Sequence, residues 1–452
     1  MNIEDIIDRR PLGTFQIRVA ALCGLVVFMA GFNTQAIGYV VPAIIDDWAI
    51  DRAAFAPVFA AGLTGIMIGA LICGPLADRI GRRPILIGCV LWFGVMSSAT
   101  TTATSINELL LFRLLTGFGI GGALPNAIAL TSEYTPRRQR TTASMVMFCG
   151  FSFGAATAGF TAAALTTAFG WVSIFLVGGV VPCAATVPLL LLLPESIRYL
   201  SDLERGKSQV ARILAAIDPG LQTTVADAFV VEREAHPRFP VAQLFSGGRL
   251  RLTLLVWVLF FMSLLVLHFV TAWLPTIVRD AGVPLDRAVL ITATFQMGAL
   301  AAALPLGRLL DRYPPFRTLG LVYLAAGVVV VLLGVAGSSV SFLFAASFGA
   351  GLCILGGQLG ANALAAQVYP TSARATGVGW ALGVGRIGSI VGPVVGGWLL
   401  SLNWESRALF TLAAVPAILA AAAAFGLNRT WRGPPQETTT NTTNTTPASC
   451  PS

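Results

Sequence analysis

Residues 74–84 read GPLADRIGRRP, and residues 307–317 read GRLLDRYPPFR. The two stretches share a Gly, an Asp and an Arg at the same spacing. These residues are Gly74, Asp78 and Arg79 in the first stretch and Gly307, Asp311 and Arg312 in the second. The offset that carries Gly74 to Gly307 also carries Trp171 to Trp404. Landmarks spread over about 95 residues of each half therefore repeat at one spacing, which predicts a chain built of two homologous halves.

The composition indicates a membrane protein. Of the 452 residues, 56% are hydrophobic and only 11% are charged, which is far from the balance of soluble globular proteins. A helix needs roughly 20 apolar residues to cross the hydrocarbon core of a bilayer. Twelve such runs lie at residues 16–40, 53–76, 84–102, 106–132, 141–168, 171–193, 251–274, 288–310, 316–335, 340–366, 375–400 and 405–426.

These runs predict an all-α membrane protein with twelve transmembrane helices in two pseudo-symmetric six-helix bundles. A charged stretch between the halves reads as a linker with a short amphipathic surface helix at 202–217, and the C-terminal ETTTNTTNTTPASCPS is expected to be disordered. The predicted parts are an N-terminal segment (1–15), the first bundle (16–194), the linker (195–250), the second bundle (251–428) and a tail (429–452).

The distribution of basic residues predicts the orientation. With the N-terminus inside, 23 of the 29 Lys and Arg residues fall on cytoplasmic segments, four fall outside, and two, Arg113 and Arg386, fall within helices. Cytoplasmic loops of membrane proteins collect basic residues, so both termini are expected to be cytoplasmic. The same asymmetry explains the net charge of +8, and we expect no nucleic-acid partner.

The sequence offers no support for enzymatic chemistry. The seven cysteines have no metal-ligand spacing, there are only two histidines, and the chain lacks a P-loop, a dinucleotide fingerprint and a nucleophile elbow. We therefore expect no metal, no cofactor and no enzyme activity. Any transport is expected to run on gradients rather than on ATP.

Several stretches resemble the major facilitator superfamily. GPLADRIGRRP is similar to its loop between the second and third helices, and RLLTGFGIGGALPNAIALTSEYTP (113–136) resembles its fourth helix. More narrowly, GFNTQAIGYVVPAI (31–44), LPESIRYL (193–200) and YPTSARATGVGWALGVGRIGSIVGP (369–393) resemble the aromatic acid:proton symporters of the 4-hydroxybenzoate and benzoate type. The resemblance implies a multi-pass protein of a bacterial inner membrane, which we expect to be a monomer, with its substrate site between the halves.

The loop after the second helix places opposite charges at a helix seam. Gly74 and Gly81 permit tight backbone turns. The charges that can latch and release come from Asp78, Arg79, Arg82 and Arg83. The resemblance implies that Asp78 holds the two halves together on the cytoplasmic side, with Asp311 and Arg312 as the weaker counterpart. The alternative is a solvated loop that only enforces the orientation.

Arg386 is the most informative single residue, because it lies near the predicted midplane of its helix. An arginine at a helix centre costs roughly 2.5 to 3.5 kcal/mol on insertion, and it is tolerated when it faces a polar cavity or a partner. A guanidinium group binds a carboxylate through two parallel hydrogen bonds, which favours an organic acid as substrate. A structural pairing with a carbonyl or an acid is the alternative.

The fourth helix carries two further charged residues. Arg113 lies on one face with Gly117 and Gly121, so it either caps close helix packing or handles protons and substrate at the outer end of a cavity. Glu133, at the cytoplasmic end of the same helix, is either a gate or proton group or a simple interfacial salt-bridge partner.

Polar residues interrupt several other apolar helices. Amides and a histidine in helices expected to line a cavity are candidates for substrate binding, although a single polar residue of this kind often serves only to hydrogen-bond two packed helices. These candidates are Asn33, His268, Gln296, Gln358 and Asn362, joined by Gln35 and Asn126. Candidates for flat apolar walls around an aromatic ring are Phe32, Tyr39, Phe269 and Trp273, with a packing or interfacial role as the alternative.

The first helix departs from the symporters that the chain resembles. Those carry DGFD, whereas this chain has Ala30 and Asn33 at the two acidic positions. Asparagine has nearly the shape of a protonated aspartate but cannot titrate, so proton coupling would have to pass through His268 or Glu133.

We therefore expect an importer of a small organic, and by resemblance aromatic, carboxylic acid that works by alternating access, with protons as possible co-substrate. An uncoupled facilitator of the same acids remains open. So does an efflux transporter for drugs or metabolites, although GFSFGAATAG in the fifth helix lacks the Gly-Pro pair usual in drug:proton antiporters. A non-transporting sensor is the remaining alternative.

Overall fold

The computed structural model describes residues 6–8, 12–201, 206–217, 244–245, 249–337, 339–369, 371–402 and 404–431. Most of the predicted linker and the predicted disordered tail lie outside these residues. The described part of the chain is helical, without strands.

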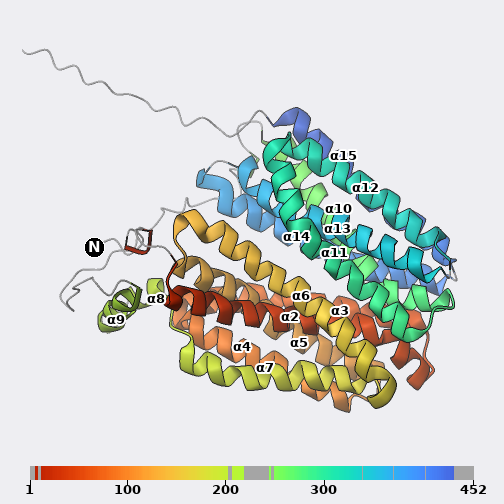
Figure 1. Ribbon diagram of the computed structural model, residues 1–452, viewed down its shortest axis with the longest axis horizontal. Coiled ribbons are helices and arrows are strands. Elements are labelled where there is room, and N and C mark those ends of the chain that lie inside the picture. Colours follow the sequence, from red (N-terminus) through yellow and green to blue (C-terminus); the bar gives the residue numbers. More distant parts are fainter. Residues whose placement is uncertain are drawn as a thin grey trace, which may run out of the picture.

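Each half of the chain contributes six long helices (Figure 1). The first half holds α2 (Thr14–Trp48), α3 (Ala56–Ile80), α4 (Arg82–Ala99), α5 (Ile106–Tyr134), α6 (Arg137–Phe169) and α7 (Val172–Leu192). The second half holds α10 (Leu250–Asp280), α11 (Leu285–Arg312), α12 (Pro315–Val335), α13 (Val340–Val368), α14 (Thr371–Ser401) and α15 (Ser406–Thr430). Short elements complete the described chain: η1 (Arg52–Phe55), η2 (Thr100–Thr102), α8 (Ile197–Ser201) and α9 (Lys207–Ile217).

The twelve helices confirm the predicted fold. Eleven of them are, in their described residues, long and apolar enough to cross a membrane. The twelfth, α11, spans 28 residues and packs against α13 of its own half and α6 of the other. Most helices extend several residues beyond the predicted apolar runs, because charged and polar turns at a membrane surface continue the same backbone hydrogen bonding.

The repeat predicted from the sequence reappears in the detail of the helices. Pro42 lies inside α2 and Pro275 lies inside α10, and these two positions are equivalent in the repeat. A proline removes one backbone hydrogen bond and bends a helix at that point. The two helices cross at the boundary between the halves, where a Cβ atom on Gly38 of α2 would lie 3.1 Å from the carbonyl oxygen of Thr271 in α10.

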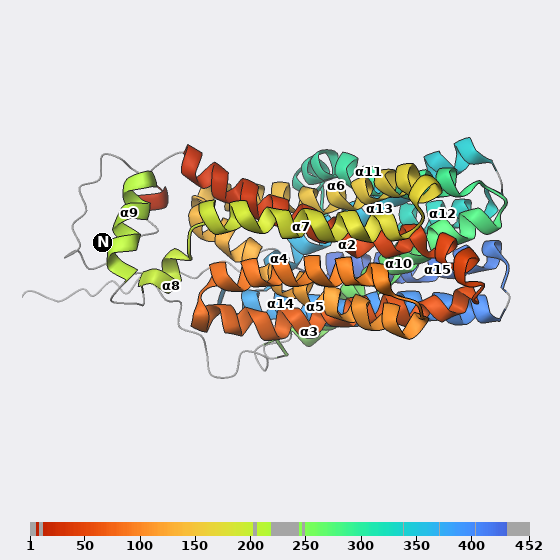
Figure 2. The same ribbon diagram turned by 90° about the horizontal axis from the view of Figure 1, so that it is seen from below.

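The halves meet through symmetry-related pairs of helices. α6 packs on α11, its counterpart α14 packs on α3, and α2 packs on α10 between them. One cluster of buried apolar side chains spans both halves in the part of the molecule farthest from α8 and α9. Towards α8 and α9, in contrast, the buried apolar residues form a separate cluster in each half. The halves are therefore joined at the end opposite α8 and α9 (Figure 2). Following the orientation expected from the basic residues, we refer to the joined end as the outer end and to the end with α8 and α9 as the cytoplasmic end.

A surface helix lies at the cytoplasmic end, within the range where an amphipathic helix is predicted. Val210, Leu214 and Ile217 share one face of α9 and are buried together with Ile6 and Ile7 from the N-terminal segment. This spacing of three and four residues is that of an apolar helix face. The first part of the linker is thereby attached to the first bundle.

Two ion pairs close the outer end across the boundary between the halves. Arg279 at the end of α10 pairs with Asp46 at the end of α2, and its Nη1 also donates to the carbonyl oxygen of Pro42 at 2.6 Å. Arg52 in η1 pairs with Asp280. Asp46 and Arg279 are themselves equivalent positions of the two halves, so the repeat places opposite charges face to face.

This contact predicts a specific cross-link. Cysteines introduced by Asp46→Cys and Arg279→Cys are expected to be joined by a short bifunctional thiol reagent. If a protease site is inserted within residues 218–243 and the chain is cut there, the joined halves should migrate together on a denaturing gel. The pair Asp46→Cys and Arg312→Cys, at opposite ends of the molecule, is the control that should separate. Separation of the halves in both pairs would contradict the described packing.

Candidate functional site

A cavity of about 180 Å³ lies between the two halves, on the cytoplasmic side of their outer contact. Helices α2, α3, α5 and α6 line it from the first half, and α10, α11, α13 and α14 line it from the second. Its polar lining consists of Thr34, Gln35, Ser152, His268, Thr271, Gln296, Gln358 and Arg386, and its apolar lining of Leu63, Ile66, Leu124, Phe148, Phe151, Leu264, Leu267, Leu355 and Leu359. Four of the predicted binding residues, Arg386, His268, Gln296 and Gln358, therefore meet in one place.

Symmetry-related positions face each other across this cavity. Gln35 and His268 hold equivalent positions of the repeat, as do Leu63 and Gln296. Arg386 falls within one position of the counterpart of Ser152. The backbone scaffold is thus repeated while the side chains differ. As a result, the charged and titratable groups of the cavity all come from the second half.

The cavity is positively charged. No Asp or Glu occurs among its described lining residues, whereas Arg386 is half-buried in its wall and forms no ion pair with any described carboxylate. The Nδ1 atom of His268 lies 2.9 Å from the carbonyl oxygen of Leu264. Since a carbonyl oxygen can only accept, Nδ1 carries a proton, and Nε2 remains available to bind or release another.

The amide of Gln358 is held in one orientation by a chain of hydrogen bonds. Its Oε1 accepts from the Ser263 hydroxyl at 2.6 Å, its Nε2 donates to Asn362 Oδ1 at 3.0 Å, and the Tyr323 hydroxyl lies 2.6 Å from that of Ser263. Asn362 is not part of the cavity lining, so it positions Gln358 rather than contacting the cavity. Gln296, in contrast, is 3% exposed, and its Oε1 has no described partner. Such an unpaired buried group is suited to a polar ligand.

The prediction about the aromatic walls is wrong. Phe32, Tyr39, Phe269 and Trp273 belong to the apolar cluster that joins the halves at the outer end. The Trp273 indole donates to the carbonyl oxygen of Pro393 at 3.0 Å, and the Tyr39 hydroxyl donates to that of Ala155 at 3.0 Å. The rings in the cavity wall are those of Phe148 and Phe151 on α6, which the sequence analysis does not single out.

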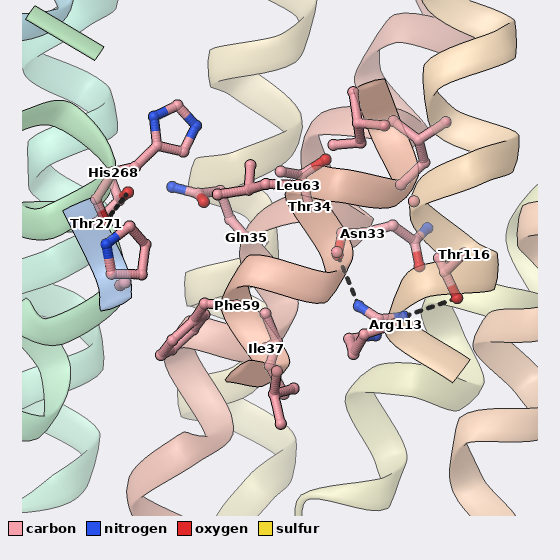
Figure 3. Close-up of a pocket in the computed structure, with 18 residues that line it drawn as sticks. Asn33, Thr34, Gln35, Ile37, Phe59, Leu63, Arg113, Thr116, His268 and Thr271 are labelled. Carbon is pink, nitrogen blue, oxygen red and sulfur yellow. Dashed lines mark hydrogen bonds between the residues drawn. The ribbon is translucent and has the colours of Figure 1, made fainter. Parts of the chain in front are cut away.

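Asn33 and Arg113 line a second, smaller cavity of about 50 Å³ beside the first (Figure 3). The side chains of Thr34, Gln35 and His268 border both cavities. Asn33 points into the first bundle, where its Nδ2 donates to the carbonyl oxygens of Met29 at 3.2 Å and Gly178 at 2.8 Å. It is therefore not a residue of the larger cavity.

Close helix packing fixes the position of Arg113. A Cβ atom at Gly117 would lie 2.1 Å from the carbonyl oxygen of Gly62, and one at Gly121 would lie 2.0 Å from that of Ile66. Only glycine permits this contact between α5 and α3. Both glycines thus have the packing role predicted for them, and Arg113 lies beside this contact, 4% exposed.

The remaining predicted residues of the first half gather at the cytoplasmic end. Arg82 Nη1 donates to Glu133 Oε1 at 2.5 Å, and the Ser196 hydroxyl donates to Glu133 Oε2 at 2.6 Å. Glu133 is therefore sealed in a salt bridge away from both cavities, in agreement with the interfacial alternative. The side chain of Asp78 is 67% exposed and lies 3.4 Å from Arg82 on its own half.

Glu195, which is not among the residues predicted from the sequence to be functional, organises this cluster. Its Oε1 accepts hydrogen bonds from the backbone N–H groups of Arg82 at 2.9 Å and Arg83 at 3.0 Å, and so caps the start of α4. The turn before α4 runs through Gly81 at φ 113°, where a Cβ atom would lie 2.6 Å from Glu195 Oε2. The Pro-Glu-Ser sequence at residues 194–196 can be recognised in the chain, but the backbone groups that Glu195 caps can be identified only from the folded structure.

In the second half, the counterpart of this loop is less constrained. Arg312 is exposed at the end of α11, with its guanidinium over the Tyr313 ring at 6.0 Å. The side chain of Asp311 lies outside the described part of the structure. Gly74 and its counterpart Gly307 have no neighbour that a Cβ atom would meet within 4 Å, so neither position requires glycine for packing. In the described structure, the predicted Asp78 latch between the halves is not formed.

Two six-helix membrane bundles with a charged cavity between them define the class of solute transporters. Among the described residues no group of three or more His, Cys, Asp or Glu side chains is placed to hold a metal ion. The family model of the Major Facilitator Superfamily matches residues 23–290 and 256–451. The chain belongs to this superfamily.

Its relatives include several transporters of known substrate. The chain is 43% identical to the 4-hydroxybenzoate transporter PcaK of Pseudomonas aeruginosa over 425 residues, which cover 94% of this chain and 95% of the relative. It is 40% identical to a gallate transporter of Pseudomonas putida, with 94% of each chain covered, and 32% identical to a benzoate transport protein of Acinetobacter baylyi, with 95% and 93% covered. These relatives are transporters rather than enzymes, and this chain is one as well.

The fold also matches solved structures. A bacterial homolog of the human lysosomal transporter Spinster, solved in an inward-facing and occupied conformation, has a TM-score of 0.72 at 16% sequence identity, with 93% of this chain and 98% of that chain covered. This likeness confirms the twelve-helix architecture.

The hydrogen-bonded group of Glu133, Arg82 and Ser196 leads to a prediction about stability. Arg82→Ala leaves a buried carboxylate without its closest counter-charge, and we expect a loss of about 2 kcal/mol in unfolding free energy. Adding Glu133→Gln to this variant should restore part of the loss. Thermal and denaturant unfolding of purified protein would measure both effects. Asp78→Asn, which alters an exposed side chain, is the control with little expected change, and an equal loss in Asp78→Asn and Arg82→Ala would contradict the proposed burial effect.

Proposed function

We propose that the chain imports a small aromatic carboxylic acid across the cytoplasmic membrane of a bacterium, acting as a monomer by alternating access. The observation that carries this proposal is the positively charged cavity between the halves, which has Arg386 in its wall and no Asp or Glu in its described lining. A half-buried guanidinium without a described carboxylate partner favours an anionic ligand, and its planar donors match a carboxylate group.

The rest of the cavity suits an aromatic ring with polar substituents. Its volume of about 180 Å³ is many times that needed for one water molecule. Phe148, Phe151 and several leucines supply apolar surface, while the oriented amide of Gln358 and the unpaired amide of Gln296 can bind a hydroxyl group. The 4-hydroxybenzoate, gallate and benzoate named for the relatives share this chemistry of one carboxylate on a ring.

The ion pairs and apolar cluster at the outer end support the alternating-access part of the proposal. In the described residues the apolar cluster shared by both halves and the ion pairs between them lie at the outer end, which permits the cavity to communicate with the other end. For substrate to enter from outside, Arg279 and Arg52 must release their acidic partners in the opposite half. These pairs are half-exposed, so separating them costs little compared with a buried pair.

We further propose that transport is coupled to protons through His268. Asn33 cannot titrate, and Glu133 is held by Arg82 and Ser196 outside both cavities. His268 borders both cavities and keeps Nε2 available, so a proton can bind there when the acid binds at Arg386. Without such coupling the chain would be a facilitator that only equilibrates the acid.

Replacing Arg386 tests the binding role. In proteoliposomes, Arg386→Ala is expected to raise the KM for 4-hydroxybenzoate uptake by about 30-fold or more, because the carboxylate loses its charged partner. Arg386→Lys keeps the charge but loses the two-pronged geometry and should fall in between. Arg429→Ala, at the exposed end of α15, is the matched control. Unchanged uptake by Arg386→Ala would rule out this site.

Replacing His268 tests the coupling. The parent protein is expected to accumulate labelled 4-hydroxybenzoate against its gradient when an inward proton gradient is imposed, and a protonophore should abolish the accumulation. His268→Ala should still equilibrate the acid but no longer accumulate it, whereas His236→Ala, which alters the other histidine of the chain, should behave as the parent. A parent that never accumulates the acid is an uncoupled facilitator, and accumulation that survives in His268→Ala contradicts coupling at this residue.

A further inference from the structure

The second intramembrane cation, Arg113, is buried in the first bundle with few of its donors satisfied. Its side chain lies between α2, α3 and α7, with Nη1 donating to the carbonyl oxygen of Asn33 at 3.2 Å and Nη2 to the Thr116 hydroxyl at 3.1 Å. The guanidinium also lies over the Phe175 ring at 4.9 Å. An arginine has five N–H donors, and the Nε of Arg113 has no described acceptor.

No carboxylate lies beside this cation. The described lining of the smaller cavity contains no Asp or Glu, and Arg113 forms no ion pair with a described residue. The acidic residue nearest in the sequence, Glu108, is exposed at the start of α5 and binds Thr104 at 2.8 Å. Neutral carbonyl, hydroxyl and ring partners offset only part of the cost of burying a full charge.

Asn33 lies beside Arg113, at a position where an acidic side chain could supply a counter-charge to the guanidinium. It is 1% exposed, its backbone carbonyl already binds Arg113, and its side-chain Oδ1 has no described partner. Two unpaired polar atoms, Arg113 Nε and Asn33 Oδ1, are therefore buried on residues that line one cavity (Figure 3). The Arg113 donor can be satisfied by an anion or by water, whereas the Asn33 acceptor can be satisfied by water.

The size of the smaller cavity selects the ligand. About 50 Å³ is room for a few water molecules or one small ion, whereas the neighbouring cavity of about 180 Å³ is the larger space available to a substituted ring. We propose that Arg113 binds a small inorganic anion such as chloride, which supplies the negative charge that residue 33 does not. This site is distinct from the substrate site at Arg386, and the inference does not depend on which acid the chain transports.

The bound anion has a structural consequence. Arg113 bridges α5 to α2 through the Asn33 carbonyl, in the part of the first bundle that borders the smaller cavity. Neutralising its charge stabilises this bridge, so the folded protein should be more stable when the anion is present. The substitution Asn33→Asp would build the negative charge into the chain and make the anion unnecessary.

The test is the melting temperature of detergent-purified protein in sodium chloride and in sodium gluconate at equal ionic strength, about 150 mM. Gluconate is too large for the smaller cavity. We expect chloride to raise the melting temperature of the parent by about 2 °C or more in a saturable way. In Asn33→Asp this chloride increment should disappear, and in Arg386→Gln, where the other cavity loses its cation, it should persist.

Three results would overturn the proposal. One is a parent with no saturable chloride increment, which would mean that water alone fills the cavity. Another is an increment of the same size in Asn33→Asp, which would place any chloride site elsewhere. The third distinguishes an organic carboxylate from an inorganic anion. In gluconate, 4-hydroxybenzoate could itself raise the melting temperature. If that increase is lost in Asn33→Asp but kept in Arg386→Gln, Arg113 binds the substrate and not an inorganic anion. Anomalous scattering from bromide beside Arg113 in a crystal would support the proposal independently.

Discussion

A buried positive charge needs a negative partner, and this chain carries two guanidinium groups within its membrane helices that have none among the described residues. In a low-dielectric environment an unpaired ion costs several kcal/mol, so such residues persist where a cavity or a ligand compensates them. Arg386 and Arg113 each border a cavity, and neither cavity has an acidic residue in its described lining. The larger one accommodates an aromatic carboxylate in our proposal, and the smaller one accommodates a small anion.

The internal repeat places equivalent helices around the cavity, and residues that differ between equivalent positions supply its charged and polar groups. Symmetry-related helices form the boundary between the halves, and the symmetry-related residues Asp46 and Arg279 close its outer end. Within the larger cavity, Gln35 of the first half corresponds to His268 of the second, and Arg386 falls within one position of the counterpart of Ser152. A symmetric fold thus carries an asymmetric cavity, in which the second half supplies the described charged and titratable groups and the first half supplies the aromatic walls.

The sequence predicts the fold well because membrane helices are long, apolar and locally determined. It also predicts four of the residues that meet in the larger cavity, Arg386, His268, Gln296 and Gln358, since a charge or amide inside an apolar helix is expensive unless it faces a polar space. The sequence does not predict the surroundings of a side chain where the rotation of its helix, or a partner distant in the sequence, determines them. Trp273 and Tyr39 pack at the outer contact rather than beside a substrate, Asn33 turns into its own bundle, and Glu195 caps α4 from a distant point of the chain. Such outcomes depend on tertiary packing and not on local pattern.

An experimental structure of the full chain in lipid nanodiscs, determined with 4-hydroxybenzoate bound, would locate the acid. We predict density for the ring in the cavity between the halves, beside Phe148 and Phe151, with the carboxylate within hydrogen-bond distance of the Arg386 guanidinium. Density for the acid elsewhere, or a carboxylate in that cavity turned away from Arg386 towards neutral groups, would contradict this prediction.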